Sequence, residues 1–264
     1  MFTLGVVNYL NALPLYRTLE TSGTARFIRF VPAQLTPRLA AGECDAALIP
    51  IVDHLRGVGS GVISNGCIGS SRAVRSVLMF TRLPISDITG VAVDTSSHTS
   101  VALLRVILAD GYGIQPPFIE HKPNLKAMLD AHDAALLIGD RALEATPIAQ
   151  EQGINILDLG TAWTEQVAHK PFVYAAWIAR KGLEPERCEE LGAMLNAARD
   201  EGLRHLPEIV RNNPIETRLT PSQIEDYLRH AIEFYLTDEH RAGMEEFRRR
   251  CQTHNLLKLP PSET

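Results

Sequence analysis

The sequence lacks long apolar runs, paired cysteines and an excess of positive charge, and each absence excludes a class of protein. No apolar stretch approaches the ~18 residues needed to cross a bilayer, so we expect no membrane partner. The four cysteines are scattered and form no Cys-x-x-Cys pair, which predicts reduced thiols rather than a zinc site or a disulfide framework. With 26 Lys and Arg against 31 Asp and Glu, the net charge of −5 argues against a nucleic-acid partner.

Several motifs of known chemistry are also missing. There is no G-x-S-x-G nucleophile elbow, P-loop or H-E-x-x-H pair, and no G-x-G-x-x-G follows the first expected strand. The nine histidines form no cluster with metal-ligand spacing, so we predict no metal site. The N-terminus has no basic segment before a long apolar core and so does not resemble a signal peptide, and we expect a cytoplasmic protein.

What the sequence does have is a regular alternation of short apolar strands and helices, which predicts an α/β fold with a parallel sheet. Strands are expected at 2–7, 27–31, 44–49, 76–81, 90–93, 114–121, 134–138, 154–159 and 171–179. Residues 57–71 hold five glycines and four serines and are interpreted as a flexible loop.

Beyond Gly182 the pattern is wholly helical, with a capping box at Thr220–Gln223 and a last helix starting near Asp238. These helices have no sheet of their own to cover, so we expect them to pack back on the first part of the chain. This predicts one lobe from residues 1–84 and 173–264 and an inserted lobe from 85–172. The crossings near 81–85 and 170–173 would then flank a ligand cleft.

Ligands of such lobes bind beyond the carboxyl ends of strands, where one junction carries five hydroxyls in the six residues 95–100. A helix start offers unpaired N–H groups and a partial positive charge, which favour an anion. Helix capping explains one of these hydroxyls but not all five. We therefore predict an anion site that includes Ser96, Ser97, His98, Thr99 and Ser100.

Two other junctions and the first crossing supply further candidates. Asn11 follows the first strand, and Gly139 and Asp140 follow the strand 134–138. Asn11 and Asp140 are equally good helix caps, and that alternative stays open. Arg75 and Ser76 lie just before the crossing, where Arg75 has the alternative of a plain surface charge. Together these residues are rich in hydrogen-bond donors and poor in bases, which suits binding carboxylates.

Five motifs, in this order along the chain, resemble those of the chorismate dehydratase (MqnA) family of the futalosine route to menaquinone. They are NYLNALPL at 8–15, GECDAALIP at 42–50, RSVL at 75–78, DTSSHTS at 94–100 and LIGD at 137–140. The resemblance implies a two-lobe, periplasmic-binding-protein-like fold of type II. It also implies a lyase that removes water from chorismate to give 3-[(1-carboxyvinyl)oxy]benzoate, with no metal or organic cofactor.

The resemblance also implies roles for the candidate residues. Asn11 and Ser76 would be catalytic, with Asn11 orienting the leaving hydroxyl. The hydroxyl-rich helix start would hold the ring carboxylate as charge spreads into it. The remaining substrate-binding candidates are Ser96, Ser97, His98, Thr99, Ser100, Arg75, Gly139 and Asp140.

The catalytic base is not identified by the sequence. As a helix cap, Asp140 would favour its charged form and accept a proton poorly. Cys67 has no neighbour in sequence that would activate it and is interpreted as an inert, packed thiol. Our hypothesis is that the enolpyruvyl carboxylate of chorismate itself takes the proton, because the side chain that carries it is attached to the carbon that loses the proton.

Two other functions fit the same pattern. One is the 1,4-dihydroxy-6-naphthoate synthase of the same pathway, which has the same fold and is expected to use a histidine base; His98 is the one histidine within the motifs. The other is a non-catalytic solute-binding protein for a small carboxylate. The oligomeric state is not predicted.

Overall fold

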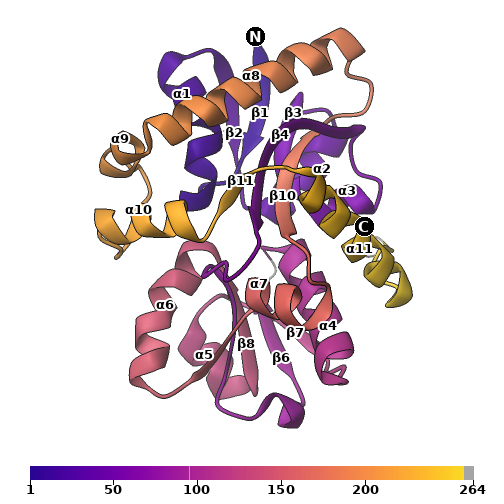
Figure 1. Cartoon of the computed structure of the whole chain (residues 1–264), viewed down its shortest axis with the longest axis vertical. Coiled ribbons are helices and arrows are strands. Elements are labelled where there is room, and N and C mark those ends of the chain that lie inside the picture. The colour runs from indigo at the N-terminus through magenta and orange to yellow at the C-terminus, as the bar shows by residue number, and fades with distance from the viewer. Residues whose placement is uncertain (95, 259–264) are drawn as a thin grey trace.

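The computed structural model describes residues 1–94 and 96–258, which form two lobes, each built on one β-sheet (Figure 1). The strands of the first sheet are β1 (Phe2–Val6), β2 (Ala25–Arg29), β3 (Ala46–Pro50), β4 (Gly61–Ser70), β10 (Phe172–Ala179) and β11 (Glu233–Tyr235). Those of the second are β5 (Val77–Thr81), β6 (Val91–Asp94), β7 (Phe118–His121), β8 (Ala134–Ile138) and β9 (Asn155–Asp158). The orders are β11-β4-β10-β3-β1-β2 and β7-β6-β8-β5-β9.

Helices flank both sheets. The first lobe has η1 (Leu10–Ala12), α1 (Leu13–Ser22), α2 (Pro32–Ala40) and α3 (Ile51–Leu55), and the second has η2 (Ile85–Asp87), α4 (His98–Tyr112), α5 (Leu125–Ala131), α6 (Gly139–Glu151), α7 (Leu159–Ala162) and η3 (Trp163–Val167). The tail adds α8 (Pro185–Arg204), α9 (Leu206–Arg211), α10 (Pro221–His230) and α11 (Asp238–Thr253). No helix in these described ranges is long and apolar enough to span a membrane.

The two-lobe α/β prediction is confirmed, but both sheets are mixed rather than parallel. Strand β1 is parallel to β2 and β3, whereas β10 runs antiparallel to β3 and β4. In the second sheet, β6 is parallel to β7 and β8, and β5 runs antiparallel to β8 and β9. The antiparallel strands β5 and β10 are those that enter the second lobe and return from it.

The interpretation of residues 57–71 as a loop is wrong, because 61–70 form the long strand β4. This strand lies between β10 and β11, whose backbones supply the hydrogen bonds that composition alone does not signal. Its glycines permit close packing: a Cβ built on Gly69 would lie 3.0 Å from both the His240 ring and the carbonyl oxygen of Phe172. At Gly59, Gly66 and Gly69 the glycines that indicated flexibility therefore allow close contacts, whereas Gly57 and Gly61 have open space beside them.

Two boundaries differ from the predicted ones. The tail is not wholly helical, because β11 pairs with β4 at the edge of the first sheet. Strand β5 belongs to the second sheet, so the chain first changes lobe between Ser70 and Val77 and not at 81–85. A buried apolar strand carries no local mark of the sheet it joins, which explains this error. The return crosses between Val167 and Phe172, where the second crossing was predicted.

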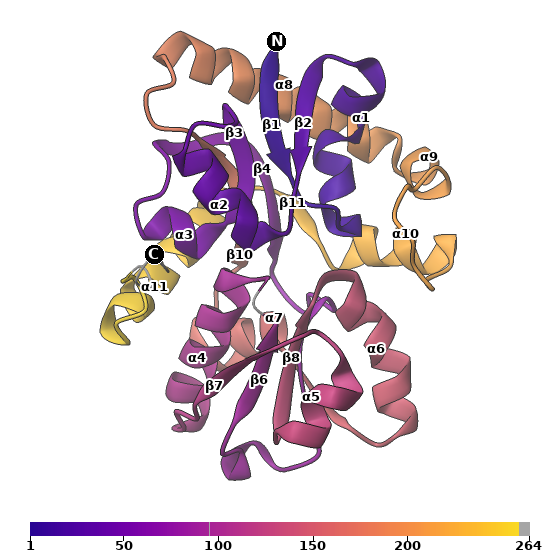
Figure 2. The ribbon, with the colours of Figure 1, turned by 180° about the vertical axis from the view of Figure 1, so that it is seen from behind.

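The helical tail packs back on the first lobe, as expected. Helix α8 lies along α1 and β4 (Figure 2). At Gly202 of α8, a Cβ would lie 2.0 Å from the carbonyl oxygen of Pro14, so only glycine allows this approach. Helix α11 packs on β10 of the first lobe and α4 of the second. The tail therefore contacts both lobes.

Candidate active site

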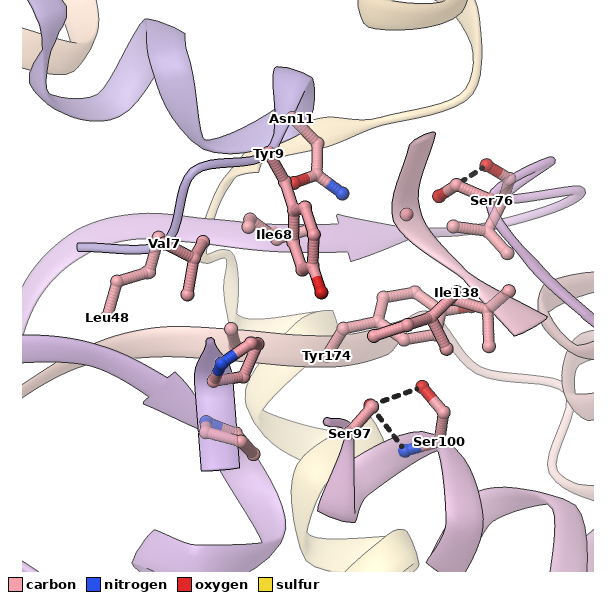
Figure 3. A pocket seen from close by; sticks show the side chains of 16 residues that line it. Val7, Tyr9, Asn11, Leu48, Ile68, Ser76, Ser97, Ser100, Ile138 and Tyr174 are labelled. Atoms are coloured by element: carbon pink, nitrogen blue, oxygen red, sulfur yellow. Dashed lines mark hydrogen bonds between the residues drawn. The ribbon is translucent and has the colours of Figure 1, made fainter. Parts of the chain in front are cut away.

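A cleft with an empty volume of about 520 Å³ lies between the lobes, beyond the carboxyl ends of β1, β3, β6 and β8. Polar side chains lie on two of its sides, with the Tyr9 ring pointing between them (Figure 3). The lining residues are Val7, Tyr9, Asn11, Pro32, Leu48, Pro50, Ile68, Val74, Ser76, Val77, Ser97, Ser100, Ile138, Gly139, Tyr174 and Ala175.

On one side, Asn11 and Ser76 are joined through a residue of the tail. The Asn11 amide nitrogen donates to the Tyr227 hydroxyl at 3.1 Å, and that hydroxyl donates to the Ser76 Oγ at 2.7 Å. All three side chains are buried. The Asn11 Oδ1 is buried with no hydrogen-bond partner, so it is an acceptor available to a ligand. Asn11 lies within η1 and caps neither η1 nor α1, which answers the alternative left open by the sequence.

The backbone before Ser76 is held in an unusual conformation. Arg75 has φ 62°, in the left-handed region that side chains other than glycine rarely adopt. The Arg75 N–H donates to the Asp158 carboxylate at 2.7 Å, and its guanidinium donates to Asp226 of α10 at 2.6 Å. Arg75 therefore faces away from the cleft lining, and it fixes the turn that presents Ser76.

On the other side, the start of α4 supplies Ser97 and Ser100. Ser97 caps the helix: its Oγ accepts from the Ser100 N–H at 3.3 Å and donates to the Ser100 Oγ at 2.8 Å. Both line the cleft. Ser96 lies outside the lining, although its buried Oγ has no partner. Thr95, the first hydroxyl residue of the motif, lies outside the described residues.

Thr99 and His98 contact the first lobe instead of the cleft. The Thr99 Oγ1 accepts from the Val52 N–H at 3.2 Å. The His98 Nδ1 lies 2.8 Å from the Asp53 carboxylate, which Arg56 also contacts at 3.1 Å. Burial would raise the Asp53 pKa, but the hydrogen bond and charge of His98, with the charge of Arg56, outweigh it and lower that pKa. This pair joins the lobes beside the cleft.

At the start of α6, Gly139 lines the cleft while Asp140 lies behind it. Gly139 has φ 61°, and a Cβ built there would lie 3.3 Å from the Tyr9 ring, so glycine lets that ring pack closely. The Asp140 carboxylate accepts from the Leu10 N–H at 3.2 Å. The cap of α6 is Ile138, so the interpretation of Asp140 as a charged helix cap is wrong. Burial raises the pKa of Asp140 to about 7.

The electrostatics of the cleft come from neutral groups. None of the sixteen lining side chains carries a full charge at neutral pH. Partial positive charge comes from the starts of α4 and α6, which both meet the cleft. Burial raises the pKa of Tyr9 and of Tyr174, so both phenols stay protonated. Such a site can bind an anion through N–H and O–H groups.

Bases and metal ligands are scarce around the cleft. Cys67 is fully buried, and burial raises the pKa of its thiol to about 12, which makes it a poor nucleophile. Within 1–94 and 96–258, no three His, Cys, Asp or Glu side chains are grouped so that they could hold a metal ion.

The structure thus brings five predicted site residues to one cleft and leaves five outside its lining. Asn11, Ser76, Ser97, Ser100 and Gly139 line it. The five outside the lining are Arg75, Ser96, His98, Thr99 and Asp140. Sequence reasoning missed the three tyrosines at the site: Tyr9 stood within the recognised 8–15 motif, whereas Tyr174 and Tyr227 looked like core residues of a strand and a helix.

Solved structures resemble this fold at low sequence identity. A protein from Archaeoglobus fulgidus has a TM-score of 0.69 at 17% identity, covering 97% of this chain and 98% of that one. The alkanesulfonate-binding protein of Xanthomonas axonopodis pv. citri has a TM-score of 0.66 at 17% identity, covering 98% and 94%. A Candida albicans protein described as having the generic periplasmic-binding-protein fold has a TM-score of 0.65 at 10% identity, covering 97% and 93%. These likenesses confirm the predicted fold.

Sequence relatives are more specific. The chorismate dehydratase of Thermus thermophilus is 31% identical over 260 residues, which cover 93% of each chain. A family profile described as menaquinone biosynthesis matches residues 2–253. The match extends over both lobes and most of the tail, including every residue of the cleft. The chain belongs to this menaquinone-biosynthesis family.

Proposed function

We propose that this protein is a lyase that removes water from chorismate to give 3-[(1-carboxyvinyl)oxy]benzoate. The observation that carries the proposal is the 31% identity to the Thermus thermophilus chorismate dehydratase over 93% of both chains. The uncharged, donor-lined cleft adds support, because N–H and O–H groups at helix starts suit a small dianion.

The ring carboxylate would bind at the start of α4. Ser97 donates its proton to the Ser100 Oγ, which leaves the Ser100 hydroxyl free to donate to the carboxylate, beside the N–H groups of the first helical turn. This carboxylate is conjugated through the ring to the C–H bond that breaks, so negative charge spreads into it as the proton leaves. Donors already in place at that point lower the barrier without having to reorient.

Asn11 and Ser76 would hold the leaving hydroxyl on the opposite side. The Asn11 Oδ1 can accept from that hydroxyl, and the Ser76 hydroxyl can donate to its oxygen. As the ring C–H bond breaks, its electrons form the aromatic ring and the C–O bond breaks. The departing hydroxide leaves as water with a proton that balances the one lost from the ring, which the protonated enolpyruvyl carboxyl group supplies.

The enolpyruvyl carboxylate of the substrate is the proposed base. The side chains lining the cleft include no carboxylate, imidazole or amine. His98 is held by Asp53, and the Asp140 carboxylate faces the Leu10 N–H. A carboxylate on a side chain of the reacting carbon needs only the correct conformer, and such proximity contributes on the order of 7 kcal/mol in favourable geometries.

The test is to incubate the purified protein with chorismate and follow the aromatic product by chromatography and absorbance. We expect turnover by the wild type and strongly reduced turnover by Asn11→Ala. Chorismate that binds without reacting would favour a solute-binding protein of the kind that shares the fold. Neither binding nor turnover would point to another substrate, such as that of the 1,4-dihydroxy-6-naphthoate synthase.

A further inference from the structure

We propose that Tyr227 of the tail helix α10 is a positioning residue for this reaction. Its hydroxyl orients Asn11 and Ser76 so that the first presents an acceptor, and the second a donor, to the leaving hydroxyl. This inference rests on the proposed function. It gives the helical tail a part in the chemistry in addition to its part in packing.

The direction of the Tyr227–Ser76 hydrogen bond fixes the direction of the Asn11–Tyr227 bond. A phenol has one proton, and Tyr227 donates it to the Ser76 Oγ at 2.7 Å. Tyr227 can then only accept from Asn11, so the amide nitrogen faces Tyr227 at 3.1 Å and Oδ1 is left over. The Ser76 proton has only the Val74 carbonyl oxygen, at a long 3.4 Å, and can turn to a ligand.

If both hydrogen bonds ran in the reverse direction, Asn11 would present a donor to the cleft instead of an acceptor. If Ser76 donated to Tyr227, Tyr227 would donate to Asn11, and the amide would turn its NH₂ group toward the cleft. A leaving hydroxyl must be held through its own proton and must receive a donor on its oxygen as charge develops there. The observed direction supplies both. Burial raises the pKa of Tyr227 well above its ordinary value, so its hydroxyl remains a donor at working pH.

The position of Tyr227 is fixed by the packing of α10. The helix begins at the Thr220 capping box, and Ile224 and Leu228 are buried on the same face as Tyr227. The Ser76 carbonyl also accepts from the Gly139 N–H of the second lobe at 2.7 Å. The segment that carries Ser76 is therefore held by Tyr227 of the tail and by Gly139 of the second lobe. Tyr227 also ties this segment to Asn11 of the first lobe.

The test compares Tyr227→Phe with the matched control Tyr16→Phe. Both tyrosines are 1% exposed, and the Tyr16 hydroxyl donates only to the Val7 carbonyl, at 3.4 Å. We expect Tyr227→Phe to lower kcat by about 10- to 100-fold with KM within about threefold, because misplaced reacting groups cost rate more than binding. The control should stay within about twofold of the wild type in both constants.

A double-mutant cycle separates positioning from a purely structural role. Because Tyr227 acts through both Asn11 and Ser76, in a background that combines Asn11→Ala with Ser76→Ala the change Tyr227→Phe should lower kcat by less than about twofold further. Full additivity in that background, or a Tyr227→Phe enzyme with wild-type kcat, overturns the proposal for Tyr227 alone. A wild type that does not turn over chorismate overturns the proposed function and, with it, this role.

Discussion

The two polar sides of the cleft are built in different ways. The α4 side comes from one turn of chain, in which Ser97 and Ser100 bond to each other. The opposite side is assembled from Asn11, Ser76 and Tyr227. Tyr227 lies 216 positions from Asn11 and 151 from Ser76 along the chain. The first side can exist wherever the helix forms, whereas the second requires both lobes and the tail to be in place.

The largest loss of turnover should follow from disrupting the side of the cleft assembled from Asn11, Ser76 and Tyr227, called the assembled side below. Asn11→Ala removes the buried acceptor and should lower kcat by more than about 100-fold, the range found when one preorganised polar group is removed from an active site. Asn8→Ala is the matched control, because Asn8 belongs to the same motif but is exposed. Initial rates of aromatic product formation measure the effect. Equal rates for the two variants would contradict a role for Asn11.

Substitutions on the α4 side of the cleft should weaken ligand binding more than they lower kcat. Ser100→Ala removes a hydrogen bond to a charged group, and Ser97→Ala removes the hydroxyl that orients Ser100, so each should cost about 1.5–3 kcal/mol, or roughly 10- to 160-fold in product affinity. Thr99→Val should lower the melting temperature and leave the product affinity nearly unchanged, since Thr99 accepts a hydrogen bond from Val52 of the other lobe. Calorimetric titration with the product measures affinity. If the serine variants bind like the wild type, the carboxylate lies elsewhere.

The same contrast explains what the sequence could predict. The strand–helix alternation and the hydroxyl-rich helix start are local patterns, and both correspond to observed structure. The role of Tyr227 could not be predicted, because Ile224, Tyr227 and Leu228 have the i, i+3, i+4 spacing of any buried helix face. The predictions for strand β4 and for the first crossing were wrong for the same reason, because pairing with strands distant in sequence determines both.

A smaller loss of turnover is expected at His98, on the far side of the α4 start. His98→Ala removes this contact between the lobes, but Arg56 and Thr36 remain on the Asp53 carboxylate, so its charge is not left unpaired. Turnover should fall by less than about 100-fold, below the upper part of the range for losing a general base. A loss near 10⁴-fold, with folding and binding intact, would instead make His98 the base.

The smallest effect on turnover is expected for Asp140→Asn, whose main consequence should be on stability. Burial raises the pKa of Asp140 to about 7, above the ~3.9 of an unfolded aspartate. The folded protein therefore holds a proton that the unfolded chain releases between pH 4 and 7. The stability contributed by this group is present below pH 4 and is lost as the pH rises through 7.

Asparagine keeps an acceptor for the Leu10 N–H and carries no charge at any pH. The melting temperature of the variant, relative to that of the wild type, should therefore rise between pH 5 and pH 8, by about 3–8 °C. Turnover should stay within about 100-fold, because the carboxylate holds the backbone beside Asn11 and does not line the cleft. Melting curves of both proteins at the two pH values measure the gap. A constant gap would mean that Asp140 is ionised throughout, and that the assembled side of the cleft holds a buried charge after all.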